Sequence, residues 1–182
     1  VLLYDAWVFF MRPEVSVWRF LTGTAWQPRI DEFGIFPLLN ATLLTSIIGL
    51  SFALPIGLGI AIYLSEYASP RARGMLKPTL EVLAGIPTVV FGFFALGFVT
   101  PALQGLFGSG RVEIFNVASA GIVIGILIIP LISSMSEDAL SAVPRAMREA
   151  AYGMGATKFE TASRIVLPAA VSGIAAAFIV AM

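Results

Sequence analysis

The chain has 182 residues, of which 58% are hydrophobic and 12% are charged, and its mean hydropathy is +0.93. A soluble domain of this length cannot bury so much apolar surface, so the composition excludes an ordinary water-soluble protein and indicates several membrane-spanning helices. The net charge of zero argues against nucleic-acid binding. The lack of Cys and His removes disulfides, thiol chemistry, imidazole bases and the usual zinc sites. A metal site built from carboxylates alone stays open on composition, but no acidic cluster suggests one. We therefore expect no catalytic residue, no metal site and no cofactor.

Stretches without charge locate the helices. No Asp, Glu, Lys or Arg occurs in residues 33–65, 82–110 or 114–136, and each stretch can hold the roughly 20 apolar residues that cross a bilayer. We predict an all-α polytopic bundle, a single transmembrane domain over residues 1–182. Its expected spans are 1–11 (partial), 37–64, 82–106, 115–136 and 169–182 (partial), with a polar loop at 137–168. Both termini fall within apolar runs, so we expect a chain truncated at both ends.

The distribution of basic residues predicts an orientation. If residues 66–79 and 137–168 face the cytoplasm, that side holds seven Lys and Arg residues and the opposite side holds four. The seven are Arg71, Arg73, Lys77, Arg145, Arg148, Lys158 and Arg164, and the four are Arg12, Arg19, Arg29 and Arg111. This excess agrees with the positive-inside rule. Residues 20–33 then form an outer loop.

Proline and glycine interrupt the predicted spans. Pro55, Pro87 and Pro130 each remove a backbone donor from a helix, and Gly85-Ile86-Pro87 is the sharpest break. It is either an ordinary kink or a broken helix whose N-terminus is directed at an anion. Gly121-x-x-x-Gly125 is a weaker signal, for close packing between two helices.

The polar loop predicts two short helices joined by a glycine turn. Residues 145–154 favour a helix, Gly153 and Gly155 end it, and Thr157-x-x-Glu160 is a capping box for the next helix. The second helix places four apolar residues on one side: Phe159, Ala162, Ile165 and Val166. Such a slim pair either enters a groove on a partner or simply connects two spans at the membrane surface.

Two charge pairs are further hypotheses. Arg148 and Glu149 are neighbours that could pair near the inner mouth of a pathway, although a surface pair is usually weak. Glu81, at the inner end of a span, either pairs with Arg73 or Lys77 or is simply solvated.

Together these residues resemble a known family. Glu149-Ala150-Ala151, three residues, Gly155, nine residues and then Ile165-x-Leu167-Pro168 match the EAA loop of ABC-importer permeases. Within that group, roughly residues 15–182 resemble the phosphate-specific permease of the PstC type. The segments that carry this finer resemblance are 20–28, 57–68, 81–94 and 142–151.

The resemblance implies a MetI-like permease fold and a set of partners. Such a non-catalytic permease lies in the plasma (inner) membrane of a bacterium or archaeon. It pairs with a second permease (PstA type) and an ATP-binding subunit dimer (PstB type), and it receives phosphate from an extracytoplasmic binding protein (PstS type). The coupling to the ATPase is expected at the EAA-loop residues: Glu149, Ala150, Ala151, Gly155, Ile165, Leu167 and Pro168.

The substrate path is less well defined by the sequence. No Lys or Arg lies within a predicted span, so backbone donors at helix breaks, polar side chains or a further helix would contact phosphate. The candidates are Asn40, Thr42, Thr45, Gly85, Pro87 and Thr88. The alternatives are a permease for sulfate, molybdate or an organic solute, or a membrane enzyme or sensor that transports nothing. The enzyme lacks an evident reactive constellation, and the sensor lacks an output domain.

Overall fold

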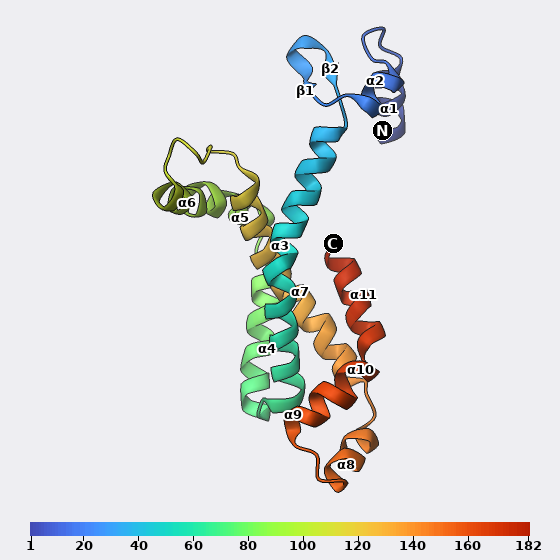
Figure 1. The fold of residues 1–182 in the computed structure, drawn as a ribbon, viewed down its shortest axis with the longest axis vertical. Helices are drawn as coiled ribbons and strands as arrows, with labels where there is room; N and C mark the ends of the chain where they lie inside the picture. Colours follow the sequence, from blue (N-terminus) through green and yellow to red (C-terminus); the bar gives the residue numbers. More distant parts are fainter. The chain divides into compact units, whose positions relative to one another are not determined.

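A computed structural model describes all residues from 1 to 182 and divides into two compact units, Val1–Thr45 and Ser46–Met182 (Figure 1). Nearly all of the regular structure is helical, so the predicted all-α class is confirmed. The one exception is a small hairpin within the residues predicted as an outer loop.

The first unit contains two short helices, this hairpin and the first turns of a long helix. Its elements are α1 (Leu2–Phe10), α2 (Val17–Thr22), β1 (Trp26–Gln27), the 3-10 turn η1 (Pro28–Ile30) and β2 (Glu32–Phe33). Asp31 has a φ of 56°, a left-handed conformation that a short polar side chain tolerates in a turn. The Phe9 ring lies edge-on to Phe20 and Phe33, with centroids 6.1 and 5.2 Å apart. Aromatic contacts therefore hold the hairpin and α2 against α1.

The long helix α3 (Phe36–Ile62) continues through a π-helical turn, η2 (Tyr63–Tyr67). It corresponds to the span predicted at 37–64, and Pro55 lies inside it without ending it. The second unit begins within this helix, at Ser46. The other elements of the second unit are α4 (Pro70–Ala84), α5 (Thr88–Phe94), the π-turn η3 (Ala95–Val99), α6 (Thr100–Phe107), α7 (Val117–Ser141), α8 (Arg145–Gly153), α9 (Lys158–Thr161), the π-turn η4 (Ala162–Val166), α10 (Leu167–Ala169) and α11 (Val171–Ala181).

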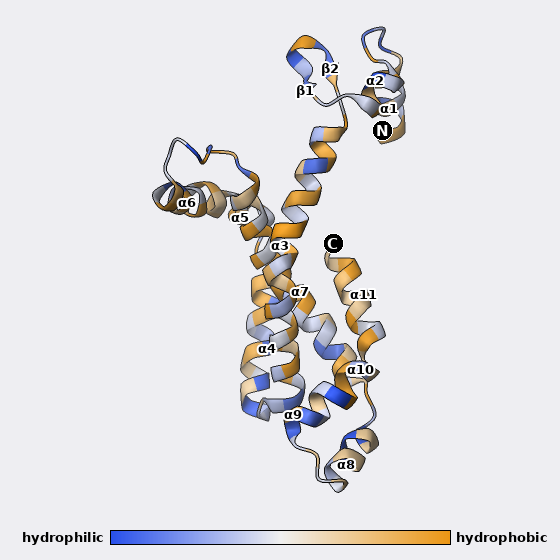
Figure 2. Ribbon diagram, viewed as in Figure 1, coloured by the Kyte–Doolittle hydropathy of each residue, from blue (hydrophilic) through white to orange (hydrophobic).

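Three helical stretches have the length and hydropathy of a membrane span: Phe36–Tyr67, Thr88–Phe107 and Val117–Ser141. A fourth arises if Lys158–Ala169 and Val171–Ala181, bent by 69° at Ala170, count as one span. The predicted multispanning class is therefore confirmed. Figure 2 shows apolar residues along α3, α7 and α11, and hydrophilic residues on α9 and at the lower end of α4.

Some helix limits differ from the prediction. The span expected at 82–106 begins at Thr88, because Pro87 separates α5 from α4, and residues 82–84 end α4 instead. The span expected at 115–136 continues to Ser141. Glu137 therefore lies in a helix and not in the predicted loop. The predicted span stopped before Glu137 because a lone charge is unfavourable in a membrane, whereas in the structure Glu137 pairs with Arg73 and Lys77.

Glycines bring α3 and α7 close together in the second unit. A methyl group placed on Gly49 would lie 3.0 Å from the carbonyl oxygen of Gly121 and 3.2 Å from the backbone nitrogen of Gly125. The Gly121-x-x-x-Gly125 pair therefore faces Gly49, as the sequence motif indicated. Small residues let two helix backbones approach in this way, which increases their van der Waals contact in a membrane.

The main hydrophobic core lies where α3, α7 and the chain after α9 meet. Its buried members are Ala61, Leu140, Val143, Val166, Ala170 and Ile174. Helix α11 packs along α7 on the same side (Figure 1). The core therefore connects the ends of two predicted spans to residues of the polar loop.

We expect the Gly125→Ala variant to be less stable than the wild type. Its methyl group would press against the Phe52 ring and lie 2.8 Å from the carbonyl oxygen of Gly49, and overpacking of this kind typically costs about 1–3 kcal/mol. Thermal unfolding of the detergent-solubilised full-length protein measures the effect. Gly59→Ala on α3 is the control, because its added methyl group would meet no atom within 4 Å apart from its chain neighbours and the backbone of its own helix. Equal melting temperatures for the two variants would contradict the close crossing.

Candidate functional site

The glycine turn predicted in the polar loop is present. Helix α8 ends at Gly153, and Gly155 has a φ of +87°, a conformation that favours glycine because it lacks a Cβ atom. The N–H of Gly155 donates to the carbonyl of Tyr152 at 2.9 Å, and the N–H of Ala156 donates to that of Ala151 at 3.0 Å. These bonds satisfy carbonyls at the end of α8 and reverse the chain.

The predicted capping box at Thr157 and Glu160 is also present. The N–H of Glu160 donates to the Thr157 hydroxyl at 3.3 Å, and the N–H of Thr157 donates to the Glu160 carboxylate at 3.0 Å. This reciprocal pair satisfies two donors at the start of α9. The helical path then continues through η4 and α10 to Ala169.

The seven EAA-loop residues divide between surface and core. Glu149, Ala150, Gly155 and Pro168 are exposed, Ala151 is fully buried, and Ile165 and Leu167 are half-buried. Leu167 also packs against the main core. The residues up to Gly155 are therefore mostly accessible to a partner, whereas Ile165 and Leu167 pack within the protein.

Large apolar side chains surround this exposed turn. Met147, Tyr152, Met154 and Phe159 are all exposed, with Met154 and Phe159 at 81% and 71%. Sequence reasoning placed Phe159 on one face with Ala162 and Val166, but those two are buried. The predicted stripe is therefore split between surface and core, and its last residues, from Ala162 to Val166, form the π-turn η4 instead of a regular α-helix. Exposed apolar residues grouped on a polar segment are typical of a docking surface.

Arg148 faces the interior, unlike its neighbour Glu149. Its guanidinium donates to the Glu66 carboxylate from Nη2 at 2.9 Å and from Nε at 3.2 Å. It also donates to the carbonyl oxygens of Val143 and Leu140, at 2.6 and 2.8 Å. The predicted pair with Glu149 was therefore wrong, because a nearly buried carboxylate on another element takes the guanidinium.

A second charge cluster joins α4 to α7. The fully buried carboxylate of Glu137 accepts hydrogen bonds from Arg73, from Lys77 at 2.8 Å and from the Ser141 hydroxyl at 2.9 Å. Lys77 also contacts Asp138 at 3.2 Å. The proposed pairing of Glu81 with Arg73 or Lys77 was wrong, and Glu81 is exposed.

Sequence reasoning singled out neither Glu66 nor Glu137 as a partner. The one signal for them is that each is the first charged residue after a long apolar stretch. Their cations come from distant segments, so no local pattern identifies the pairs.

The proposed substrate-path residues fall into two groups. Asn40, Thr42 and Thr45 lie on α3 within the first unit, and the two threonine hydroxyls donate to Leu38 and Ala41 of their own helix. The other candidates, Gly85, Pro87 and Thr88, lie at the break between α4 and α5 and are exposed. Since the groups belong to different units, the path remains a prediction.

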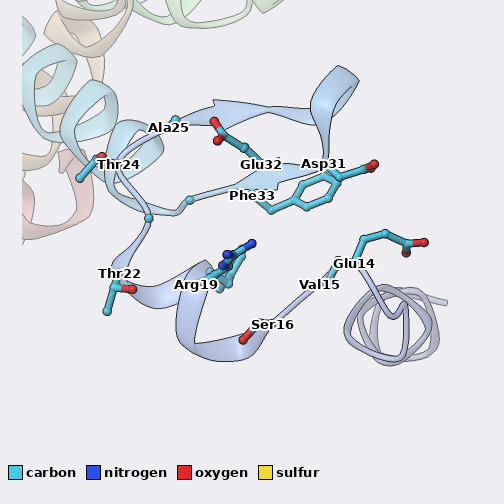
Figure 3. A pocket seen from close by; sticks show the side chains of 13 residues that line it. Glu14, Val15, Ser16, Arg19, Thr22, Thr24, Ala25, Asp31, Glu32 and Phe33 are labelled. Carbon is cyan, nitrogen blue, oxygen red and sulfur yellow. The ribbon is translucent and has the colours of Figure 1, made fainter.

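The first unit contains a polar cavity of about 310 Å³. Figure 3 shows the Arg19 side chain between α2 and the hairpin, with the Glu32 side chain on the hairpin above it. Glu14 and Asp31 add two more carboxylates to the lining. The cavity thus includes part of the loop that resembles the outer loop of the phosphate-specific family. Its lining carries one cation, Arg19, and three carboxylates.

Lys77 provides a pH-dependent test of the α4–α7 cluster. Its hydrogen bond to Glu137 raises the pKa of Lys77 above the ordinary value of 10.5. A raised lysine pKa means that the stabilisation is complete below the ordinary value and is lost as the pH rises through the folded-state pKa. We expect Lys77→Met to be less stable by about 1 kcal/mol or less near neutral pH, because solvent reaches the pair. This difference from the wild type should vanish in strong alkali.

Thermal unfolding of both proteins across this pH range provides the measurement. Lys158→Met is the control, because Lys158 is exposed and outside the cluster. A deficit for Lys77→Met that stayed constant into strong alkali would contradict the assignment.

Comparison with known proteins agrees with this architecture. Residues 53–182 match the family described as "Binding-protein-dependent transport system inner membrane component". That range contains both charge clusters and the whole segment from α8 to α11.

Individual relatives cover most of this chain. The "Probable ABC transporter permease protein YqgH" of Bacillus subtilis is 32% identical over 92% of the chain and 54% of its own length. The "Phosphate transport system permease protein PstC" of Haemophilus influenzae is 35% identical over 82% of the chain and 53% of its own length. The protein of the same name in Mycobacterium leprae is 32% identical over 87% of the chain and 56% of its own length. The chain thus spans about half the length of these relatives. It belongs to the family of binding-protein-dependent transport system inner membrane components.

Proposed function

We propose that this chain is part of the permease subunit of an ATP-driven importer of inorganic phosphate. The observation that carries the coupling role is the exposed glycine turn after α8, edged by Met147, Tyr152 and Met154 on a segment outside the long apolar helices. Relatives named as phosphate transport permeases support the substrate.

The exposed turn suits a soluble ATP-binding partner. Ala150 and Gly155 keep the turn narrow, while the thioether of Met154 adapts its shape to a facing groove. In the proposed assembly, an ATP-binding subunit dimer (PstB type) docks here and performs the hydrolysis, so the permease itself is not an enzyme. A second permease (PstA type) and an extracytoplasmic phosphate-binding protein (PstS type) complete the importer in a bacterial or archaeal inner membrane.

The packing of the turn supports transport by alternating access. The segment after α9 enters the main core through Val166 and Ala170, which pack with Ala61 of α3 and Leu140 of α7. A close-packed core transmits displacement instead of absorbing it. Movement of the docked turn when the ATPase subunits close on ATP would therefore shift the ends of two spans and open the pathway outward. Hydrolysis would reset it.

We expect Gly155→Arg to abolish ATP-driven uptake while the protein remains in the membrane. The large side chain would fill the docking groove, and a non-glycine residue at this φ costs about 1–2 kcal/mol. Gly155→Asn is the matched control, because Asn tolerates a left-handed backbone and is small. Uptake is measured in cells with equal membrane levels of both variants. Normal uptake by Gly155→Arg would disprove docking at this turn.

The substrate is tested by uptake of labelled phosphate. The full-length protein is co-expressed with its own partner subunits in cells that lack other high-affinity phosphate uptake, and sulfate and molybdate serve as competitors. We expect ATP-dependent uptake that neither competitor reduces. Inhibition by sulfate or molybdate would contradict a phosphate-specific permease, and no phosphate uptake despite correct assembly would reject phosphate as the substrate.

The orientation is tested with topology reporters. A reporter inserted next to Ala156 should give a cytoplasmic signal, because the proposed ATPase docks there. One inserted next to Gly108, between α6 and α7, should give an external signal. The opposite pattern would overturn the orientation predicted from the Lys and Arg distribution.

A further inference from the structure

Arg148 occupies an unusually complete hydrogen-bonding environment. Its three guanidinium nitrogens all donate: Nε and Nη2 to the Glu66 carboxylate, and Nη1 and Nη2 to the carbonyls of Val143 and Leu140. The side chains of Arg148 and Glu66 are only 16% and 4% exposed. Breaking a pair this deeply buried is costly, because the remaining charge has little access to water.

These contacts join three separate elements. Glu66 lies in η2, at the end of α3, and its carboxylate also accepts a hydrogen bond from the Ser65 hydroxyl at 3.0 Å. Leu140 lies in the last turn of α7, and Val143 lies in the link to α8. One guanidinium on α8 therefore holds the ends of the two long helices that cross at Gly49 and Gly125.

The position of Arg148 on α8 suits a transmitting role. Successive residues of a helix point about 100° apart, so Arg148 can face inward while Glu149 remains exposed. The exposed turn thus follows directly on the helix that carries the internal anchor, and that helix has only nine residues. A partner that displaces the turn would pull directly on the Arg148 contacts.

The contacts also require arginine. A planar guanidinium can bind a carboxylate through two nitrogens and still donate to backbone carbonyls in other directions. A lysine ammonium keeps the charge, but its three donors sit on one nitrogen and cannot reach the Glu66 carboxylate and both backbone carbonyls at once. Replacement by lysine therefore separates the geometry of the link from its charge.

We propose that Arg148 and Glu66 form the positioning link that makes α8 move together with the ends of α3 and α7, so that motion at the docking turn reaches the transport pathway. This inference rests on the proposed coupling of the turn to an ATPase. It assigns no contact with substrate to either residue. The charge cluster of Glu137 joins α4 to α7 and does not include α8.

The first test measures phosphate import and ATP hydrolysis together in proteoliposomes that contain the complete transporter. We expect Arg148→Lys, Arg148→Gln and Glu66→Gln to retain hydrolysis but to lower phosphate moved per ATP by about tenfold, within the usual range for coupling between sites. The double variant Glu66→Gln/Arg148→Gln should be no worse than either single variant, because both remove the same link. Arg145→Gln is the matched control on α8, where Arg145 is exposed.

A purely structural role would give a different result. Hydrolysis and import would then fall in parallel with the amount of assembled complex, and the ratio of phosphate to ATP would stay at the wild-type value. That result, or an Arg148→Lys variant with normal coupling, would overturn the proposal.

The second test does not depend on the substrate. Residues 1–182 contain no cysteine, so spin labels can be placed on Ala146→Cys, on α8 but outside the docking turn, and on Tyr67→Cys, both of which are exposed positions. In the wild-type background, we expect the same distance distribution in the nucleotide-free and vanadate-trapped complexes. In the Arg148→Gln background, trapping should broaden or shift the distribution, whereas Arg145→Gln should behave as the wild type does. Unchanged distributions in Arg148→Gln would overturn the link even if the transported solute proved not to be phosphate.

Discussion

Two carboxylates at the ends of long apolar helices place the strongest constraint on this protein. Glu137 is fully buried and Glu66 is nearly so, and charges in such places are stable only when cations and hydrogen bonds compensate for the lost water. Arg73 and Lys77 on α4 are the cationic partners of Glu137, and Arg148 on α8 is the cationic partner of Glu66. The short helices beside the spans are therefore held in place by charge as well as by apolar packing.

Close helix contact provides the complementary constraint. Gly49 and Gly125 let α3 and α7 cross almost backbone to backbone, and the core around Leu140 joins their ends to the chain after α9. A membrane offers little hydrophobic drive for bringing helices together, so this packing relies on small residues. In the proposed importer, the rigid crossing and the charged anchor together would carry motion from a cytoplasmic ATPase to the spans.

The contrast between the two sides of α8 explains how one short helix can serve both purposes. Ala151 and Arg148 fix it to the protein, while Glu149, Ala150 and Met154 remain available to a partner. The capping box at Thr157 then starts α9 in a defined direction. A flexible connection would dissipate a displacement, whereas this arrangement keeps the docking turn and the anchor within a few residues of each other.

The sequence alone determined the helical membrane class, the glycine turn and the capping box, because these follow from composition and from residues within one or two turns of each other. It also carried the EAA pattern that anticipated the family. Only the tertiary structure decided which charges pair: Arg148 and Glu66 are 82 residues apart, and Arg73 and Glu137 are 64 apart. It also revealed that Glu137 extends α7 and that a π-turn divides the apolar stripe after Phe159. Local patterns cannot specify such features, because burial and long-range partners exist only once the helices have packed.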